Sequence, residues 1–248
     1  MGSVPVTSYG EETLRCCCCG KKSRHTVLLS SNTFGGSTHL DQRPPGMYGS
    51  TVEHWLQECP YCGYVAWDIA YGDDKARHFT STPQFSAASL DPDPDPAVRR
   101  FLVRAAFEAF HGDRRSAFLY TLHAAWVADD YKKTGEARAL RLKAAEHLAG
   151  VRIASIDTRL RLLDVLRRAS NWSLAEALIA ELTSEELEYP FAEIVSFHRD
   201  RVGARDDGRY TIEQALEGRP EPPVTIDDPE LIKAIARHIK IIPNPRRR

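Results

Sequence analysis

The sequence has no long hydrophobic run and no excess of charge of either sign. No segment approaches the roughly 18 consecutive apolar residues of a membrane-spanning helix, so we expect no membrane partner. The 33 basic and 34 acidic side chains give a formal net charge of -1, which leaves no overall field favouring nucleic acid. The first residues also lack a basic stretch followed by an apolar segment, the pattern of a secretory signal. We therefore expect a cytoplasmic location.

Cysteine is absent after residue 62, and all six cysteines fall in two short motifs, residues 16–20 (CCCCG) and 59–63 (CPYCG). Each motif can be written CxxCG, in which two thiolates flank a tight turn and the glycine lets the backbone bend back toward sulfur. Four sulfurs can then surround one tetrahedral ion at about 2.3 Å. In a reducing compartment such cysteines bind metal rather than form disulfides. We predict one structural Zn²⁺ per chain with these ligands: Cys16, Cys19, Cys59 and Cys62.

The first motif leaves its pairing open, because four consecutive cysteines permit other ligand choices. The pair Cys16 and Cys19 matches the second motif best. Cys17 and Cys18 are then spare, one packed as a small apolar side chain and one exposed. A redox dithiol is an alternative use of CxxC.

A histidine ligand in place of one cysteine is a further alternative, with His25 and His54 the nearest candidates. Four thiolates would form a closed shell, whereas a catalytic zinc keeps one position open for water. The cysteine count therefore favours a structural site over a catalytic one.

The front of the chain is expected to form short strands. Residues 24–30 and 51–57 are two of them. Alternation over residues 64–71 predicts a third strand with four large side chains on one sheet face: Val65, Trp67, Ile69 and Tyr71. This sheet is small, so metal binding is expected to stabilise it.

Alternating Asp and Pro residues predict a stiff, solvated linker over residues 80–95. Asp95 can cap a helix whose first turn contains Pro96. From there the hydrophobic period changes to about 3.6 and predicts helices over residues 96–111 and 114–131, followed by further antiparallel helices. The fourth helix counted from residue 96, around residues 160–169, has two apolar faces and is expected to lie between neighbouring helices.

The predicted fold is therefore α+β, a small β zinc ribbon followed by an all-α, tetratricopeptide-like array. Part of the repeat pattern is present, but no second copy aligns. The expected organisation is a zinc-ribbon domain (1–79), an Asp/Pro-rich linker (80–95), a helical-repeat-like domain (96–217) and a C-terminal segment (218–248). That last segment combines a Pro-rich linker, an amphipathic helix capped by Asp228 and a basic tail.

Candidate partner-binding residues come from two places. The first is the basic turn formed by Lys21, Lys22 and Arg24, which a nucleic acid could contact or which could be a solvated turn. The second is Arg43, next to two prolines that preset the backbone, together with Trp126. The alternative for Arg43 is a pairing within the chain, with Asp41 or with the adjoining helical face.

The densest group of potential acids, bases or ligands in the helices is Glu108, His111, His123, Asp129 and Asp130. No nucleophile motif or phosphate-binding loop accompanies it. Asp129 and Asp130 can equally end a helix in a solvated turn. Catalysis at this group is kept as an alternative.

Four segments together resemble an uncharacterised bacterial family, a domain of unknown function in which a CPxCG-type zinc ribbon precedes tetratricopeptide-like helices. The matching segments are residues 40–47, 59–64, 123–130 and 209–212. The resemblance implies the architecture and a zinc ion on Cys16, Cys19, Cys59 and Cys62, but no activity. The CCCC run and the C-terminal arginine tail depart from it.

The function that needs the fewest assumptions is a non-enzymatic adaptor that binds a protein or peptide through its helices. A nucleic-acid-associated factor would use the basic turn together with Arg246–Arg248. A metal-dependent hydrolase would use the region of His123 and Asp130. The sequence does not indicate an oligomeric state.

Overall fold

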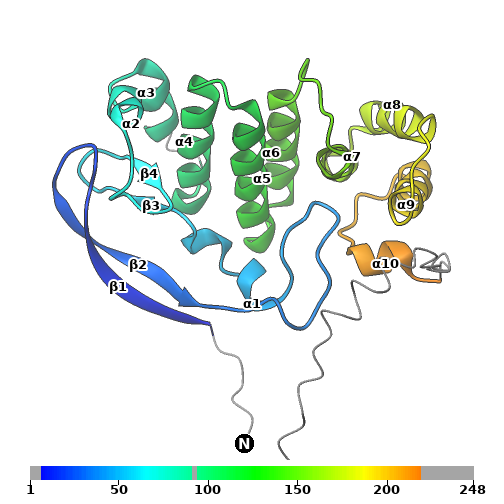
Figure 1. The fold of residues 1–248 in the computed structure, drawn as a ribbon, viewed down its shortest axis with the longest axis horizontal. Coiled ribbons are helices and arrows are strands. Elements are labelled where there is room, and N and C mark those ends of the chain that lie inside the picture. Colours follow the sequence, from blue (N-terminus) through cyan, green and yellow to red (C-terminus); the bar gives the residue numbers. More distant parts are fainter. Residues whose placement is uncertain (1–6, 91–93, 219–248) are drawn as a thin grey trace, which may run out of the picture. The chain divides into compact units, whose positions relative to one another are not determined.

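Two β hairpins lie in the front part of the chain, and each carries one cysteine motif at its turn (Figure 1). A computed structural model describes residues 7–90 and 94–218. In the first hairpin, β1 (Ser8–Arg15) pairs antiparallel with β2 (Lys22–Ser30). In the second, β3 (Gln57–Glu58) pairs antiparallel with β4 (Val65–Ala66). The strand expected over residues 24–30 is therefore confirmed as part of β2.

The other two strand predictions are largely wrong. Residues 52–54 form a short 3-10 helix, η1 (Val52–His54), whose turn buries both Val52 and Trp55. The strand expected over residues 64–71 ends after Ala66, because the Asp68 carboxylate accepts a hydrogen bond from the Ala70 N–H and turns the chain.

Three short helices follow or connect the hairpins: α1 (Gly46–Gly49), α2 (Asp74–Phe79) and α3 (Pro83–Ser89). The helix α3 lies inside the segment expected to be a solvated linker. It forms because Thr82 caps it and Pro83 occupies its first turn. Phe85 anchors it, packing edge-to-face on Phe79 at 5.6 Å between ring centroids. Residues 91–93 of the Asp/Pro run lie outside the described residues.

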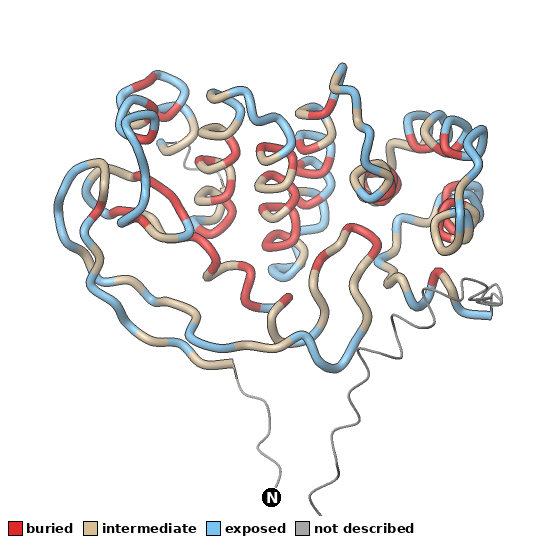
Figure 2. Tube along the Cα trace, in the orientation of Figure 1, coloured by how far each residue is buried: buried red, intermediate tan, exposed pale blue. Residues whose placement is uncertain are grey.

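The predicted helices 96–111 and 114–131 are confirmed. The next three helices lie side by side (Figure 1): α4 (Pro96–Phe110), α5 (Arg114–Asp130) and α6 (Thr134–His147). Asp95 caps α4 as expected, accepting a hydrogen bond from the Ala97 N–H at 2.9 Å. Buried residues concentrate in α5 and on the sides of α4 and α6 that face it (Figure 2). This apolar cluster also contains Val52, Trp55 and Val65, so the second hairpin and the helices share one core.

A second apolar cluster holds the last helices of the described chain: α7 (Ile156–Arg168), α8 (Trp172–Thr183), α9 (Phe191–Gly203) and α10 (Ile212–Leu216). Helix α7 contacts α6, α8 and α9, which confirms the expectation that this helix lies between neighbours. Leu40 joins the same cluster from the loop before α1. Its N–H bonds the Tyr210 carbonyl at 3.0 Å.

The compact unit formed by these elements ends at Glu217. No helix among the described residues is long and apolar enough to cross a membrane. The predicted terminal helix from Asp228 and the tail Arg246–Arg248 lie outside the described residues.

Candidate metal centre

The first cysteine motif is the turn between β1 and β2. The Cys16 N–H donates to the Lys21 carbonyl at 3.0 Å, and the Gly20 N–H donates back to the Cys16 carbonyl at 2.9 Å. Gly20 has a φ of 73°, a left-handed conformation that glycine adopts without strain. The turn therefore places Cys16 and Cys19 at one end of the hairpin.

The second motif repeats this geometry between β3 and β4. The Cys59 N–H donates to the Tyr64 carbonyl, and the Gly63 N–H donates to the Cys59 carbonyl, both at 2.8 Å. Gly63 has a φ of 71°, nearly the value of Gly20. Two copies of one local turn thus present two thiols each.

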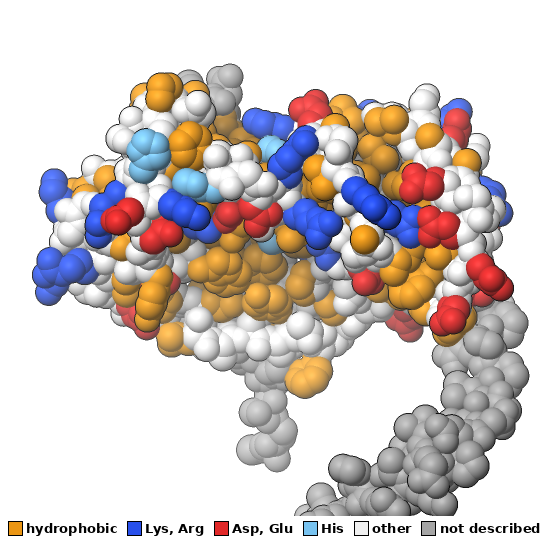
Figure 3. All heavy atoms as spheres, turned by 45° about the horizontal axis from the view of Figure 1, so that its top comes forward, with side chains coloured by type: hydrophobic (Ala, Val, Ile, Leu, Met, Phe, Trp, Pro, Cys, Tyr) orange, Lys and Arg blue, Asp and Glu red, His pale blue; other side chains and the backbone are white. Residues whose placement is uncertain are grey.

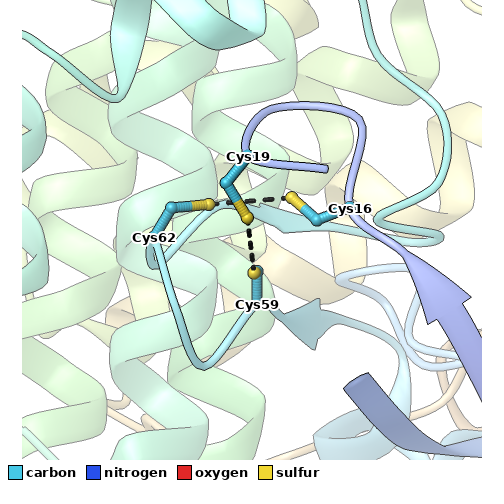
Figure 4. A group of neighbouring side chains, drawn as sticks. All are labelled: Cys16, Cys19, Cys59 and Cys62. Atoms are coloured by element: carbon cyan, nitrogen blue, oxygen red, sulfur yellow. Dashed lines mark hydrogen bonds between the residues drawn. The ribbon is translucent and has the colours of Figure 1, made fainter. Parts of the chain in front are cut away.

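The four predicted ligand sulfurs meet between the two turns (Figure 4). Cys16 Sγ lies 3.6 Å from Cys62 Sγ, and Cys19 Sγ lies 3.6 Å from Cys59 Sγ. All four sulfurs lie within 4.8 Å of one another. A tetrahedral ion with metal–sulfur bonds of about 2.3 Å needs sulfurs about 3.8 Å apart, so the cluster can hold a metal ion.

The surroundings of the sulfurs are largely apolar and shift the pKa values of the thiols in different directions. Cys16 and Cys59 are buried in a small apolar cluster with Tyr64 and Ile69. Burial acts to raise the pKa of the Cys19 thiol, but the backbone N–H of Lys21 and the neighbouring thiols lower that pKa overall. Burial raises the pKa of the other two shifted ligands, Cys59 and Cys62.

The spare cysteines Cys17 and Cys18 are not part of the four-sulfur group, although both pack against the same small apolar cluster. Cys17 Sγ and Cys18 Sγ lie 3.7 Å apart. Both thiols are partly buried, so the expectation that one would be exposed is wrong. The Cys17 N–H donates to the Ile69 carbonyl at 2.9 Å, which ties the first turn to the chain that follows the second.

The candidate histidine ligands lie elsewhere in the fold. His25 Nε2 is 2.7 Å from the Ser23 hydroxyl. His54 pairs with Glu53 at 3.2 Å and packs against the Tyr9 ring. Among the described residues, the four cysteines form the only metal-ligand group of three or more His, Cys, Asp or Glu side chains.

The partner-binding role expected for Arg43 and Trp126 is corrected by their burial, since each is only 3% exposed. The Arg43 guanidinium donates to the carbonyls of Gly49 and Trp126 and pairs with Asp130 at 2.5 Å. The Trp126 indole donates to Asp41 at 2.7 Å. These side chains hold the loop before α1 against α5, as the alternative for Arg43 anticipated.

The acids and histidines considered for catalysis do not form one site, because each makes its own structural contacts. Asp129 pairs with Arg141 and Arg168. Asp130 pairs with Arg43. Burial lowers the pKa of His123 to about 3, so this imidazole is neutral at physiological pH.

Glu108, the remaining acid of that group, pairs with Arg104 at 2.5 Å. The His111 ring packs edge-to-face on Phe107 at 4.7 Å between centroids. Neither side chain joins a metal-ligand group among the described residues.

The basic turn is exposed at Lys21, Lys22 and Arg24. Lys21 Nζ lies 4.8 Å from the centre of the Tyr61 ring, and Arg24 pairs with Glu11. On the face that Figure 3 shows, basic and acidic side chains are intermixed. Binding of a partner at this turn stays a prediction.

Sequence reasoning missed the ionic network around Asp41. This carboxylate is only 1% exposed and accepts from both Trp126 and Arg168. Arg168 in turn pairs with Asp129, as does Arg141. The partners of Asp41 are 85 and 127 residues away, so no local pattern identifies them.

The fold and the site define a class: a metal-binding module of two cysteine turns, joined through a shared core to an array of helices. Comparison with protein-family models, curated proteins and solved structures finds no match for this chain. The family resemblance given above therefore stays a prediction.

Proposed function

We propose that this protein is a non-enzymatic adaptor, in which a structural zinc ion holds the two cysteine turns and a tetratricopeptide-like helical array binds a protein partner. Zinc is supported by four cysteine sulfurs that lie within 4.8 Å of one another, close enough to share one tetrahedral ion. Its role is structural because four thiolates leave no open position for water or substrate.

The observation that carries the adaptor function is an apolar groove between α6, α7 and α8. Its floor and walls contain six leucines: Leu142, Leu148, Leu162, Leu166, Leu174 and Leu178. The cavity has a volume of about 660 Å³. Leu142 and Leu174 are 36% and 54% exposed, although leucine gains free energy by burial.

The groove continues into a neighbouring hollow of about 680 Å³. The two share Leu148, Leu162, Leu178 and Glu181, so they form one elongated surface. An elongated, leucine-lined groove is the shape that accepts the apolar face of an amphipathic helix.

The charged residues at the edge of the groove indicate which side chains a partner helix should carry beside its apolar face. Glu146 and Glu181 line the first hollow, and Glu185 lines the second. Arg159 compensates two of them, contacting Glu181 at 3.5 Å and pairing with Glu185. Arg152 also lines the second hollow, so the acidic excess lies at the first, where Glu146 has no ion-pair partner among the described residues. The proposed partner is therefore an amphipathic helix of another protein with basic residues beside the part of its apolar face that enters the first hollow.

A defined probe tests this proposal. A labelled helical peptide with leucines at positions i, i+3, i+4 and i+7 and flanking lysines should bind the zinc-loaded protein in a fluorescence-anisotropy titration. The same peptide with flanking glutamates should bind more weakly, because the edge carries carboxylates.

Two substitutions supply the comparison. Leu174→Glu places a charge in the groove and should abolish binding. Leu29→Glu changes a leucine that is 61% exposed outside the groove and should leave binding intact. Equal binding of the peptide to both variants would refute the groove as the docking site.

A further inference from the structure

Another hollow, separate from the two that form the leucine-lined groove, lies beside the metal centre. It has a volume of about 520 Å³. The chain after the second cysteine turn forms one wall with Tyr64, Trp67 and Tyr71, and α4 contributes Arg104 and Phe107. None of these residues is a metal ligand, so the hollow is available while a metal is bound.

Two of the aromatic side chains are unusually exposed. Trp67 is 53% exposed and Tyr71 is 76% exposed. One face of the Trp67 ring stacks on the buried Trp55, with centroids 5.9 Å apart and planes 17° apart. Trp55 in turn stacks on Tyr48 at 5.0 Å. Trp67 is thus the outer ring of a rigid stack, and its free face is a ready contact surface.

The charge of the hollow is negative. Asp68 and Asp73 line it, and each carboxylate accepts a backbone hydrogen bond, from Ala70 at 2.7 Å and from Ala76 at 3.2 Å. Among the described residues neither carboxylate pairs with a lysine or arginine, although Asp68 lies near enough to His25 to act on it electrostatically. The cation in the lining, Arg104, is already matched by Glu108 at 2.5 Å. Two carboxylates without a lysine or arginine partner therefore line the hollow beside exposed aromatic rings.

The walls of the hollow are fixed by both cysteine turns. The Cys17 N–H donates to the Ile69 carbonyl at 2.9 Å, and the Tyr64 hydroxyl donates to the Tyr71 carbonyl at 3.1 Å. Gly72 packs against Cys17 so closely that a Cβ there would lie 2.6 Å from the Cys17 sulfur. A metal ion held by Cys16, Cys19, Cys59 and Cys62 would join the two turns and so help to keep Trp67 and Tyr71 in place.

We propose that this hollow binds an arginine side chain of a protein partner. The planar guanidinium stacks on the free face of Trp67 and pairs with the carboxylates of Asp68 and Asp73. Arginine fits this combination better than lysine, because its guanidinium both stacks and donates in a fork. The contact is a second docking point, independent of the leucine-lined groove.

The test uses the whole zinc-loaded protein and short blocked peptides. A Gly-Arg-Gly peptide is titrated while the indole N–H resonance of Trp67 is followed by NMR. Substitution of citrulline for arginine keeps the shape but removes the charge, and we expect at least about tenfold weaker binding. A Gly-Lys-Gly peptide should also bind more weakly than the arginine peptide.

Isosteric variants identify the carboxylates. Asp68→Asn with Asp73→Asn keeps both backbone hydrogen bonds, so the fold and metal content should be unchanged, while arginine affinity should fall about tenfold. Phe34→Ala removes a ring that is 77% exposed elsewhere and should change nothing. Chelation of the metal should abolish the titration.

Each contrary result has a definite meaning. Equal affinity for the arginine and citrulline peptides, or an unchanged affinity in the Asn variant, would overturn the proposal. Tighter binding of the lysine peptide would overturn arginine as the occupant. Leu174→Glu blocks the groove but not this hollow, so the peptide titration with that variant separates a failure here from a failure of the adaptor function.

Discussion

The indole nitrogen of Trp126 lies 2.7 Å from Oδ2 of Asp41, and this bond joins the loop before α1 to the middle of the helical array. Arg168 donates to the same oxygen at 2.9 Å from α7. Both residues of the indole bond are almost completely buried. One carboxylate thus connects three segments that are distant in sequence.

Substitution of Asp41 should destabilise the protein more than substitution of Trp126, because Asp41 accepts two hydrogen bonds and Trp126 donates one. Trp126→Phe removes one hydrogen bond while Asp41 keeps Arg168, so we expect a loss of about 1–2 kcal/mol in the free energy of unfolding. Asp41→Ala removes the acceptor of two buried donors, the Trp126 indole and Arg168, although Arg168 keeps Asp129, and should cost about 3–5 kcal/mol. Urea denaturation measures both, with Phe34→Ala, at a side chain that is 77% exposed, as the control. Equal effects of the two variants would contradict this assignment.

Arg43 should behave as a structural residue. Its guanidinium contacts two carbonyls and one carboxylate, an arrangement that the single ammonium of lysine cannot reproduce. We expect Arg43→Lys to lower the unfolding free energy by about 2–3 kcal/mol. Arg24→Lys, at an exposed ion pair, should change it by less than about 0.5 kcal/mol. A stable Arg43→Lys protein that has lost a partner would restore the binding role.

A variant that lacks Cys59 and Cys62 should lose the bound metal, whereas one that lacks Cys17 and Cys18 should keep it. Cys59→Ser with Cys62→Ser removes two of the four clustered sulfurs, so bound metal should fall from one ion per chain to none. The two hairpins should then lose their hydrogen-exchange protection, because structural zinc supplies roughly 10–16 kcal/mol of apparent binding free energy. Cys17→Ser with Cys18→Ser should keep the ion. Elemental analysis showing metal loss in that control would reassign the ligands.

The glycines of the two turns form a matched pair. Both have positive φ, so alanine at either position should cost about 1–2 kcal/mol. A Cβ at Gly20 meets no atom within 4 Å, whereas one at Gly63 would lie 2.9 Å from the buried Phe85 ring. Gly63→Ala should therefore lower the midpoint of urea unfolding more than Gly20→Ala does. The reverse order would show that the second turn is looser than its contacts indicate.

His198 should make stability depend on pH. Burial lowers its pKa from 6.5 to about 4; the nearby Asp164 acts to raise that pKa and Arg167 to lower it. Between pH 6.5 and 4 the unfolded chain therefore binds a proton that the folded protein does not, and stability falls as the pH falls. The expected loss is about 3 kcal/mol over that window.

The comparison is with His198→Met, which cannot titrate. Acid-induced metal loss and protonation at His123 affect both proteins, so only the difference between their stability–pH curves reports on His198. We expect the variant to have the shallower slope between pH 6.5 and 4 in urea titrations at fixed pH. Parallel curves would show that the histidine is solvated in the folded state.

Several features of the fold follow from short stretches of sequence. The spacing of Cys16, Cys19, Cys59 and Cys62 predicted the metal cluster, because each turn is built from its own backbone hydrogen bonds. The 3.6-residue period predicted the long helices, and Asp95 capped α4 as expected. These are local properties, decided by residues within a few positions of one another.

The errors arose where a side chain's environment depends on distant packing. The alternation of Val65, Trp67, Ile69 and Tyr71 predicted one sheet face, but only Val65 and Ile69 are buried, because the chain turns after Ala66. The linker prediction over residues 80–95 failed for α3, because Phe85 packs against the aromatic side chains of the core.

The sequence by itself determined the two metal-binding turns and most of the helices, since both depend on neighbouring residues. Only the tertiary structure decided that Arg43 and Trp126 are buried supports and that Trp67 and Tyr71 line an open hollow. The partners of Asp41 lie 85 and 127 residues from it. Contacts over such separations exist only when the helices pack, because no local backbone geometry brings those side chains together.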